Sequence, residues 1–319
     1  MLVAVTGASG LIGSALTRRL RAEGHQVLRL TRSRPSAPDQ VQWDPTAGRL
    51  DADALAKADA VVHLAAKNLG ERLRWNARVK RELLESRVEG TALVARTMVD
   101  LAGVPGMLKG SPPGDRTSGG PRVLVCASGV GYYGDRGDEV LTESSSPGSG
   151  FLAEVCQQWE AAADPARRAG LRVVHLRTGP VQDTAGGGLP KQALLFRLGL
   201  GGRLGSGRQW LSWTALDDIV GAYLHALTHD ELDGPVNNVA PNPVTNAEFT
   251  ATLARVLGRP ALLPVPAFAP RLVLGEAADE FLFVSQRALP VRLRETGYRF
   301  QFPELEAALR HTLNRPERD

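Results

Sequence analysis

Three glycines near the start of the sequence have the spacing that phosphate binding requires. The segment TGASGLIG places Gly7, Gly10 and Gly13 between a short apolar run (2–7) and a run with helical spacing (9–24). In such a strand–turn–helix unit, the first glycine allows a tight turn, the second lets the backbone approach a pyrophosphate, and the third lets the helix pack close to the strand. The helix N-terminus then offers free N–H groups to the phosphates. We therefore predict a dinucleotide site formed by Thr6, Gly7, Ser9, Gly10, Leu11, Ile12 and Gly13.

The end of the second predicted strand (25–32) indicates which dinucleotide is bound. A site that prefers NAD usually has an Asp or Glu about 20 residues further on, where it binds the ribose 2′-hydroxyl. Here the segment LTRSR supplies Thr31, Arg32 and Ser33 and no acidic residue. A guanidinium can meet a 2′-phosphate with paired hydrogen bonds, and hydroxyls suit it as well. We therefore predict NADP(H) as the cofactor, with these three residues around the 2′-phosphate.

Predicted strands and helices alternate along the chain, and these elements position the residues of the dinucleotide site. Apolar runs predict strands at 2–7, 25–32, 58–66, 121–129, 171–179 and 234–240, and helical spacing predicts helices at 9–24, 80–102, 148–163, 215–229, 245–258 and 302–313. Strands that alternate with helices at this pitch form parallel βαβ units, which predicts an α/β fold with a doubly wound parallel sheet.

Two domains are predicted from this order. Residues 1–180 form the cofactor-binding domain, with the sheet completed by about 215–240, and residues 181–319 form a smaller, mainly substrate-binding α+β part. The segment 106–120 is rich in Gly, Pro and Ser and is predicted to be a surface loop.

Composition excludes several classes of function. The net charge is +4 and the basic residues are spread along the chain, which does not favour a nucleic-acid partner. The only two cysteines, Cys126 and Cys156, make neither a disulfide framework nor a metal site. No apolar run reaches the roughly 18 residues of a membrane span, and the first strand leaves no room for a signal peptide. We therefore expect a cytoplasmic protein without a membrane partner.

Five further sequence segments add to the TGASGLIG motif. They are HLAA (63–66), SRVEGT (86–91), SGVGYYG (128–134), LRTGPV (176–181) and GSGRQWLSWTALDDIV (205–220). Together with TGASGLIG, they resemble the extended short-chain dehydrogenase/reductases, the superfamily of nucleotide-sugar epimerases and dehydratases.

The resemblance is closer still to one branch, an NADP-binding epimerase family whose C-terminal segment has no assigned function. The matching segments are GYYGDRGDEVLTE (131–143), FLAEVCQQWEAAA (151–163), FRLGLGG (196–202), APNPVTNAEF (240–249) and LPVRLRETGYRFQFPELEAAL (289–309). The resemblance implies an extended Rossmann fold and NADP(H) binding.

The resemblance also implies roles for individual residues. It places Leu64, Ala65 and Ala66 along the cofactor, Glu82 and Arg87 facing it from the long helix, and Val181 on the nicotinamide side.

The catalytic pair of the superfamily is missing. In its members a Tyr acts as general acid/base, a Lys four residues later lowers the pKa of that Tyr, and a Ser after the preceding strand binds the substrate oxygen. Ser128 occupies the Ser position. Two registers place either Phe151 and Val155, or Leu152 and Cys156, at the Tyr and Lys positions. Neither pair supplies a phenol or an ammonium group.

Three side chains are candidate replacements. Tyr133 ranks first, because it lies five residues after Ser128 in the segment that borders the nicotinamide site in relatives. With a pKa near 10, its phenol suits neutral pH only if a cation such as Arg177 lowers that pKa. Glu154 ranks second, as a partly buried carboxyl on the right helix. Cys156 ranks third, because a small buried Cys on an apolar helix face is usually inert. Ser128, Tyr133 and Glu154 are thus the predicted catalytic residues.

These observations favour an NADP(H)-dependent oxidoreductase or nucleotide-sugar-epimerase-like enzyme that lacks the usual Tyr-x-x-x-Lys pair. The alternative is a degenerate NADP(H)-binding sensor or protein-interaction module. The Gly-rich region 186–209, with Arg197, Arg203 and Arg208, is predicted to close over a small phosphorylated or nucleotide-linked substrate. The identity of the substrate and the direction of the reaction stay open, as does a homodimer.

Overall fold

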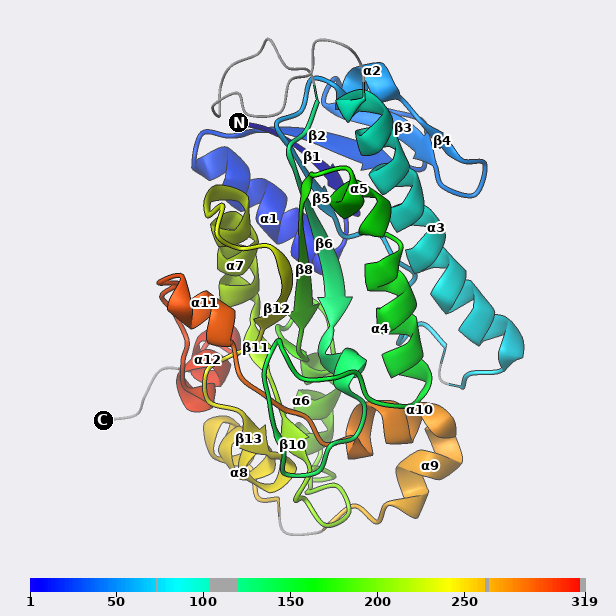
Figure 1. Ribbon diagram of the computed structural model, residues 1–319. Coiled ribbons are helices and arrows are strands. Elements are labelled where there is room, and N and C mark those ends of the chain that lie inside the picture. Colours follow the sequence, from blue (N-terminus) through cyan, green and yellow to red (C-terminus); the bar gives the residue numbers. More distant parts are fainter. Residues whose placement is uncertain (73, 104–119, 262–263, 316–319) are drawn as a thin grey trace.

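A mostly parallel sheet of eight strands forms the centre of the computed structural model (Figure 1). The structure describes the whole chain except residues 73, 104–119, 262–263 and 316–319, so the predicted loop at 106–120 lies outside the described residues apart from Gly120. The strand order is β12-β8-β6-β5-β1-β2-β3-β4, and only β3 and β4 pair antiparallel. The strands are β1 (Leu2–Thr6), β2 (Gln26–Thr31), β3 (Gln40–Asp44), β4 (Arg49–Leu50), β5 (Ala60–His63), β6 (Val123–Gly129), β8 (Arg172–Thr178) and β12 (Gly234–Asn238).

The predicted doubly wound sheet is confirmed, and its order defines where a ligand binds. Strands of a parallel sheet covered on both faces read as continuous apolar runs, and β5 is buried along its whole length. The chain runs outward from β1 through β2 and β3, and in the other direction through β5, β6, β8 and β12. Ligands of such sheets bind at the carboxyl ends of the strands, where the order reverses. Here that place lies between β1 and β5.

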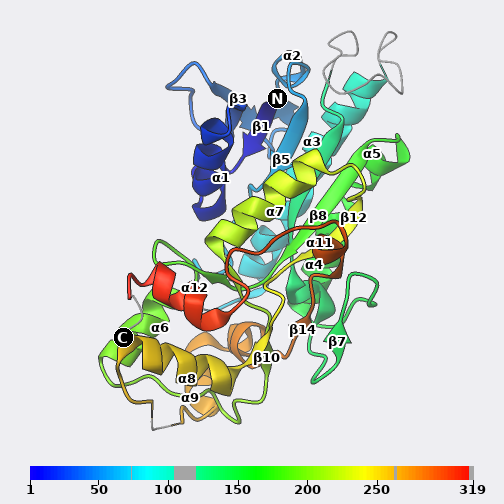
Figure 2. The ribbon, with the colours of Figure 1, turned by 90° about the vertical axis from the view of Figure 1, so that its left-hand side faces the viewer.

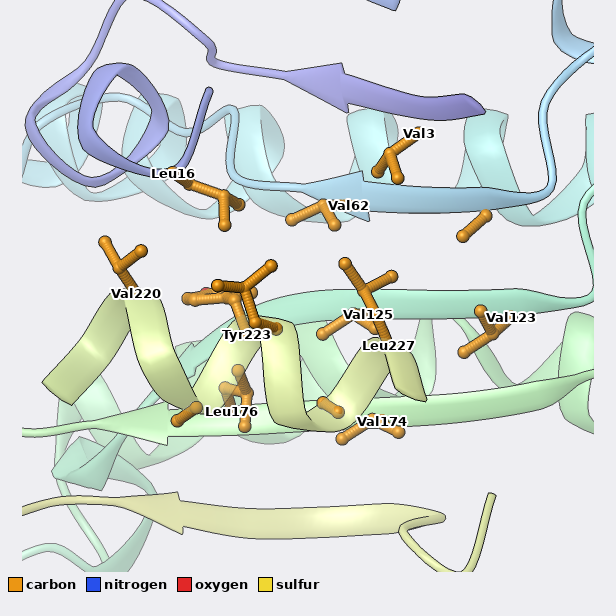
Figure 3. Packing of buried hydrophobic residues seen from close by; sticks show 14 of the residues in the cluster. Val3, Leu16, Val62, Val123, Val125, Val174, Leu176, Val220, Tyr223 and Leu227 are labelled. Atoms are coloured by element: carbon orange, nitrogen blue, oxygen red, sulfur yellow. The ribbon is translucent and has the colours of Figure 1, made fainter. Parts of the chain in front are cut away.

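Helices cover both faces of the sheet. In Figure 1, α1 and α7 lie to the left of the sheet and α3, α4 and α5 to the right. Figure 3 shows Leu16 of α1 and Tyr223 of α7 packed over Val62 and Val125 of the strands. Among the described residues, no helix is both long enough and apolar enough to cross a membrane. The helices are α1 (Leu11–Ala22), α2 (Ala52–Leu55), α3 (Ala77–Ala102), α4 (Phe151–Ala161), α5 (Asp164–Arg168) and α7 (Leu216–Thr228).

The smaller part lies beyond the carboxyl ends of the strands (Figures 1 and 2). Its core joins α6, α8 and α12 around Phe196, Trp213 and Phe249. Thr245 and Glu248 form a capping box at the start of α8. The elements are η1 (Val130–Tyr133), β7 (Val140–Leu141), β9 (Val181–Gln182), α6 (Leu189–Arg197), β10 (Trp210–Leu211), β11 (Thr214–Ala215), β13 (Val244–Thr245), α8 (Asn246–Leu257), α9 (Phe268–Leu274), α10 (Glu276–Ala278), the π-helix η2 (Asp279–Phe283), β14 (Arg287–Ala288), α11 (Val291–Glu295) and α12 (Leu305–Thr312).

The segment from α9 to α11 returns to the sheet domain. β14 pairs with β7, and α11 packs against β12. Helix α4 begins after Gly150 without a side-chain cap of its own. Instead, the carboxylate of Glu280 in η2 accepts hydrogen bonds from the backbone N–H groups of Phe151 (2.9 Å) and Leu152 (3.2 Å). The first turn of α4 is therefore completed by the C-terminal segment.

We predict that Glu280→Ala lowers the free energy of unfolding by about 1 kcal/mol, because two N–H groups at a helix N-terminus lose a charged acceptor. The neighbouring Asp279 is a matched control, since its one ion pair among the described residues is with Arg271, and both side chains are about half exposed. Asp279→Ala should change the stability by less than roughly 0.5 kcal/mol. Urea unfolding of the two variants measures the difference, and equal losses would contradict the capping role of Glu280.

Candidate functional site

The loop between β1 and α1 requires glycine for steric reasons. Gly7 has a φ of +66°, and a Cβ there would lie 2.9 Å from the backbone nitrogen of Ala65. A Cβ on Gly13 would lie 2.1 Å from the carbonyl oxygen of Gly7. The backbone of this loop therefore approaches both the end of β5 and the first turn of α1 more closely than any side chain permits. The loop forms a cradle with an open backbone surface.

Thr6 fixes this loop to the end of β5. Its hydroxyl accepts hydrogen bonds from the N–H groups of Leu64 (3.0 Å) and Ala65 (3.1 Å) and lies 2.9 Å from Nδ1 of His63. Burial lowers the pKa of His63 to about 4, so its ring is neutral and Nδ1 can accept the hydroxyl proton. The predicted residues Leu64 and Ala65 thus form one side of the cradle, and Ala66 follows them at the surface.

The first turn of α1 faces the same place. Gly10 provides no side-chain cap, and the first N–H groups of a helix have no acceptor within it. Gly186 lies over this turn, with a Cβ position 3.1 Å from Cδ2 of Leu11. Val181 and Ile12 pack against the same apolar cluster below. Val181, predicted on the nicotinamide side, contacts Gly187, the residue after Gly186, whose Cβ position lies 3.0 Å from the Val181 carbonyl oxygen.

At the end of β2, the hydroxyl oxygens of Thr31 and Ser33 lie 2.9 Å apart. The side chain of Arg32, the residue between them in sequence, is exposed, and its carbonyl accepts a hydrogen bond from Gln42. Arg32 forms no ion pair within the described part of the chain. Two hydroxyls and one guanidinium are therefore available here to bind an anion.

The two predicted residues of α3 differ in their surroundings. Glu82 pairs with Lys67, which directly follows Ala66, and with Arg78. These two cations hold the pKa of Glu82 at about 2. Arg87 is buried, and its Nη1 donates to the carbonyl of Leu83 one turn earlier (2.9 Å). The position of Lys67 beside the cofactor segment was not anticipated from the sequence.

Ser128 belongs to a buried network at the end of β6. Its hydroxyl donates to Glu160 of α4 (2.7 Å). Glu160 also accepts two hydrogen bonds of 2.8 Å from Arg177 of β8, in a pair that is almost entirely buried. Although burial opposes it, the carboxylate of Glu160 raises the pKa of Arg177. The hydroxyl proton of Ser128 is therefore taken up by its hydrogen bond to the Glu160 carboxylate, which is itself held in the buried ion pair.

Tyr133 lies in the same network, and its surroundings oppose the acid/base role predicted for it. The hydroxyl is fully buried, is 2.7 Å from Oδ1 of Asn237 and 3.0 Å from the carbonyl of Thr142, and accepts a hydrogen bond from Arg177. Arg177 does lower the pKa, as expected from the sequence. Burial raises it more, however, so that the pKa of Tyr133 is about 12.

Helix α4 presents Leu152 and Cys156, the second of the two registers, to the end of β6. A Cβ on Gly131 would lie 3.1 Å from Cβ of Leu152, and one on Gly129 would lie 3.7 Å from Sγ of Cys156. Burial raises the pKa of the Cys156 thiol to about 11, so it is not a nucleophile at neutral pH.

Glu154 does not have the predicted partial burial. It is exposed on the outer side of α4, where it bonds to Gln158 one turn later. Residues two apart on a helix face different directions, so Glu154 cannot share the face of Leu152. The structure therefore joins Thr6 and the glycine loop to Leu64 and Ala65, while Ser128 and Tyr133 are engaged in a buried network and Glu154 is exposed on α4.

We predict that Tyr133→Phe lowers the free energy of unfolding by about 1 to 3 kcal/mol, because Asn237 and Arg177 each lose a buried partner. Tyr132→Phe is the matched control. The Tyr132 ring lies under Arg177 at 3.4 Å, but its hydroxyl makes no hydrogen bond within the described residues. Thermal and urea unfolding of both variants test this. A Tyr133→Phe variant as stable as the control would contradict the network.

Comparisons with known proteins agree with this geometry. Residues 3–240 match the model of the NAD dependent epimerase/dehydratase family, and residues 265–312 match a domain of unknown function (DUF1731). Epimerase family protein ML0860 of Mycobacterium leprae is 42% identical over 318 residues, which cover 100% of this chain and 97% of that protein. Human epimerase family protein SDR39U1 is 38% identical over 314 residues, covering 97% of this chain and 99% of that protein.

Solved structures of similar proteins extend the comparison. The crystal structure of human SDR39U1 with NADPH has a TM-score of 0.83 and 35% identity and covers 98% of this chain and 99% of that chain. A nucleoside-diphosphate sugar epimerase from Corynebacterium glutamicum has a TM-score of 0.77 and 37% identity, over 98% of this chain and 58% of that chain. The chain therefore belongs to the NAD-dependent epimerase/dehydratase family, in the extended short-chain dehydrogenase/reductase superfamily, and carries the DUF1731 segment at its C-terminus.

Proposed function

We propose that this chain binds NADP(H) and is an oxidoreductase or epimerase-like enzyme that works without a Tyr-Lys pair. The observation that carries the proposal is the cradle, where the backbone contacts of Gly7 and Gly13 are too close to leave room for a Cβ atom. A pyrophosphate requires this kind of open backbone beside a helix N-terminus. The NADPH in the structure of human SDR39U1 supports the same cofactor.

The residues that bind NADP(H) in this proposal lie in three places. The backbone from Gly7 to Gly13 holds the pyrophosphate, and Thr31, Arg32 and Ser33 hold the 2′-phosphate. Leu64 and Ala65 supply apolar surface along the cofactor, and Val181 supplies it on the nicotinamide side. When bound, the cofactor supplies or accepts a hydride at its nicotinamide ring. The chain orients the partners of that transfer. When the bound cofactor would supply the hydride to a carbonyl carbon, water would give a proton to the carbonyl oxygen, and when it would accept a hydride from an alcohol carbon, the hydroxyl proton would pass to water.

The substrate is proposed to be a small anionic molecule, phosphorylated or nucleotide-linked. The exposed guanidinium groups of Arg197, Arg203 and Arg208 lie on or after α6, beyond the carboxyl ends of the strands. None of them forms an ion pair within the described part of the chain. They are therefore available to bind an anion that enters from this side.

We also propose that the protein acts in a reducing compartment such as the cytoplasm. Both cysteines are free and buried, which is typical of proteins that do not depend on disulfides. The Arabidopsis relative is named as chloroplastic, so the compartment differs between relatives.

One observation favours the alternative, a protein that binds NADP(H) without turnover. Ser128 donates to Glu160, Tyr133 is buried, and Glu154 is exposed away from the site. No sequence-predicted acid/base group of the chain is therefore free to move a proton at the cradle.

We predict that the protein binds NADPH more tightly than NADH and that Arg32→Ala removes this preference. A lost guanidinium–phosphate contact should lower the affinity for NADPH about tenfold or more, while the affinity for NADH stays unchanged. Arg19→Ala is the charge-matched control, because Arg19 pairs with Glu23 on the outer side of α1. Titration calorimetry and thermal shifts with both cofactors measure the effect. A preference that survives Arg32→Ala would contradict the assignment of the 2′-phosphate site.

A second prediction separates the enzyme from the binding module. We expect the purified protein to oxidise NADPH in the presence of at least one compound from a panel of carbonyl compounds and nucleotide-sugars. The change in NADPH absorbance measures this, with heat-denatured protein as the control. Tight NADPH binding with no oxidation across the panel would favour the binding module instead.

A further inference from the structure

Most of the large apolar side chains that are exposed belong to two segments of the smaller part. Among the described residues, ten large apolar side chains are exposed, and seven of them lie on α6, directly after it, or on α9. These seven are between 46% and 70% exposed. They are Leu194, Leu195, Leu198, Leu200, Phe268, Leu272 and Val273. Single exposed apolar residues are ordinary, whereas a group of them marks a contact with another molecule or with a membrane.

Helix α6 is apolar on two sides. The side that packs into the core shared with α8 and α12 consists of Leu189, Ala193 and Phe196. Another side, on which the residues follow one another at spacings of three and four, consists of Lys191, Leu194, Leu195 and Leu198, all exposed. A surface helix normally has one apolar side toward the core and a polar side toward water. The second apolar side of α6 therefore faces solvent without need of the core.

Helix α9 is covered even less. None of its residues is fully buried, and Phe268 and Leu272, which are four positions apart, are each 70% exposed. A helix of this length is not stable in water by itself, so it depends on packing of its apolar side. A partner that covers Phe268 and Leu272 would therefore stabilise α9.

The two segments are joined across the surface of the smaller part. The N–H of Val265 donates to the carbonyl of Arg203 (2.8 Å), and the N–H of Gly205 donates to the carbonyl of Val265 (2.9 Å). The chain after α6 therefore runs beside the segment that leads into α9. Figures 1 and 2 both show α6 and α9 in the half of the molecule opposite the N-terminus. The α6–α9 surface is defined here by the exposed side chains of Lys191, Leu194, Leu195, Leu198, Leu200, Phe268, Leu272 and Val273.

The charges of these two segments have one sign. Residues 184–216 and 259–275 contain no Asp or Glu. Their basic residues are Lys191, Arg197, Arg203, Arg208, Arg259 and Arg271. Within the part of the chain that the structure describes, only Arg271 of this set forms an ion pair, with Asp279. An apolar surface with only positive charges around it is complementary to an anionic partner.

We propose that the α6–α9 surface docks on an anionic lipid surface. Side chains as exposed as Leu198, Phe268 and Leu272 protrude from the molecule, whereas a helix or strand of a protein partner docks in a groove. Protruding leucine and phenylalanine side chains suit the boundary between lipid head groups and acyl chains. The adjoining cations are then attracted to the anionic head groups.

Such a contact needs no membrane-spanning helix. The expectation of a protein without a membrane partner rested on the absence of an apolar run long enough to span a bilayer. A helix that lies in the plane of the interface needs only one apolar side. The inference goes beyond the proposed function and does not rest on it. Because Arg197 and Arg203 are also proposed to bind the substrate, Lys191 and the leucines test the lipid contact separately.

Co-sedimentation with lipid vesicles tests the apolar contacts. We expect the wild type to bind vesicles of phosphatidylcholine and phosphatidylglycerol in equal parts, and not vesicles of phosphatidylcholine alone. The double variant Leu198→Gln/Leu272→Gln removes apolar surface without changing the charge. It should bind the mixed vesicles about tenfold more weakly or less. Val140→Gln is the matched control, because Val140 is 44% exposed on β7, outside the α6–α9 surface.

The same measurement tests the charge. Lys191→Ala should weaken binding to the mixed vesicles about threefold to fivefold, because a cation near an anionic membrane is lost. Lys57→Ala is the control, since Lys57 is exposed directly after α2, at the other end of the molecule (Figure 1). High salt should release the wild type from the vesicles, because it screens exposed charges. Binding that is equal on both kinds of vesicle, or that salt leaves unchanged, would contradict an anionic partner.

The remaining outcomes separate the lipid contact from other occupants and from the proposed function. A wild type that does not bind the mixed vesicles overturns the inference, as does equal weakening in Leu198→Gln/Leu272→Gln and Val140→Gln. Light scattering identifies a second copy as the occupant: a wild-type dimer that the double variant splits, without vesicle binding, would also overturn it. NADPH titration of the double variant should give the wild-type affinity. A wild type that binds vesicles but not NADPH would overturn the proposed function and leave the lipid contact standing.

Discussion

The close approach of two backbone segments, after β1 and after β5, determines most of what this chain can do. Gly7 meets the nitrogen of Ala65 at a distance that leaves no room for a side chain, and the Thr6 hydroxyl satisfies two N–H groups on the other side. This contact joins the two strands between which the order of the sheet reverses. It also directs α1 with its N-terminus toward the opening. The cofactor cradle is therefore a consequence of how the centre of the sheet is closed.

The local pattern of the sequence was sufficient to predict most of this architecture. Each predicted strand and helix overlaps an observed element, because apolar periodicity and glycine punctuation act over a few residues. The hairpin of β3 and β4 was not predicted, since its strands are short and largely polar. The helices of 265–300 were not predicted either. The residues that these helices contact, such as Lys80 for Glu276, lie about two hundred positions earlier in the sequence and leave no local pattern.

In the candidate site too, some residues could be predicted from local sequence patterns and others could not. The residues of the glycine loop could be placed from the sequence, because strand–turn–helix geometry fixes them locally. The family resemblance, and no local pattern, suggested Leu64, Ala65, Glu82, Arg87 and Val181. The catalytic candidates depend on burial, which spacing does not reveal. The cation on which the role of Tyr133 depended, Arg177, does donate a hydrogen bond to its hydroxyl, yet the burial of the phenol has the larger effect on the pKa of Tyr133. For Glu154 a usable signal did exist: it lies two residues from both Leu152 and Cys156, so it had to face away from them.

The cap on α4 affects the order in which parts of the protein can fold while the chain is being synthesised. Glu280 follows Phe151, whose N–H it accepts, by 129 positions. At about 5 to 20 residues per second, a ribosome needs roughly ten seconds to synthesise that interval. During this time the sheet domain can assemble while the first turn of α4 is still uncapped. The first turn of α4 therefore matures only when the last sixth of the chain has emerged, so a prematurely terminated product would have the cofactor cradle and an uncapped α4.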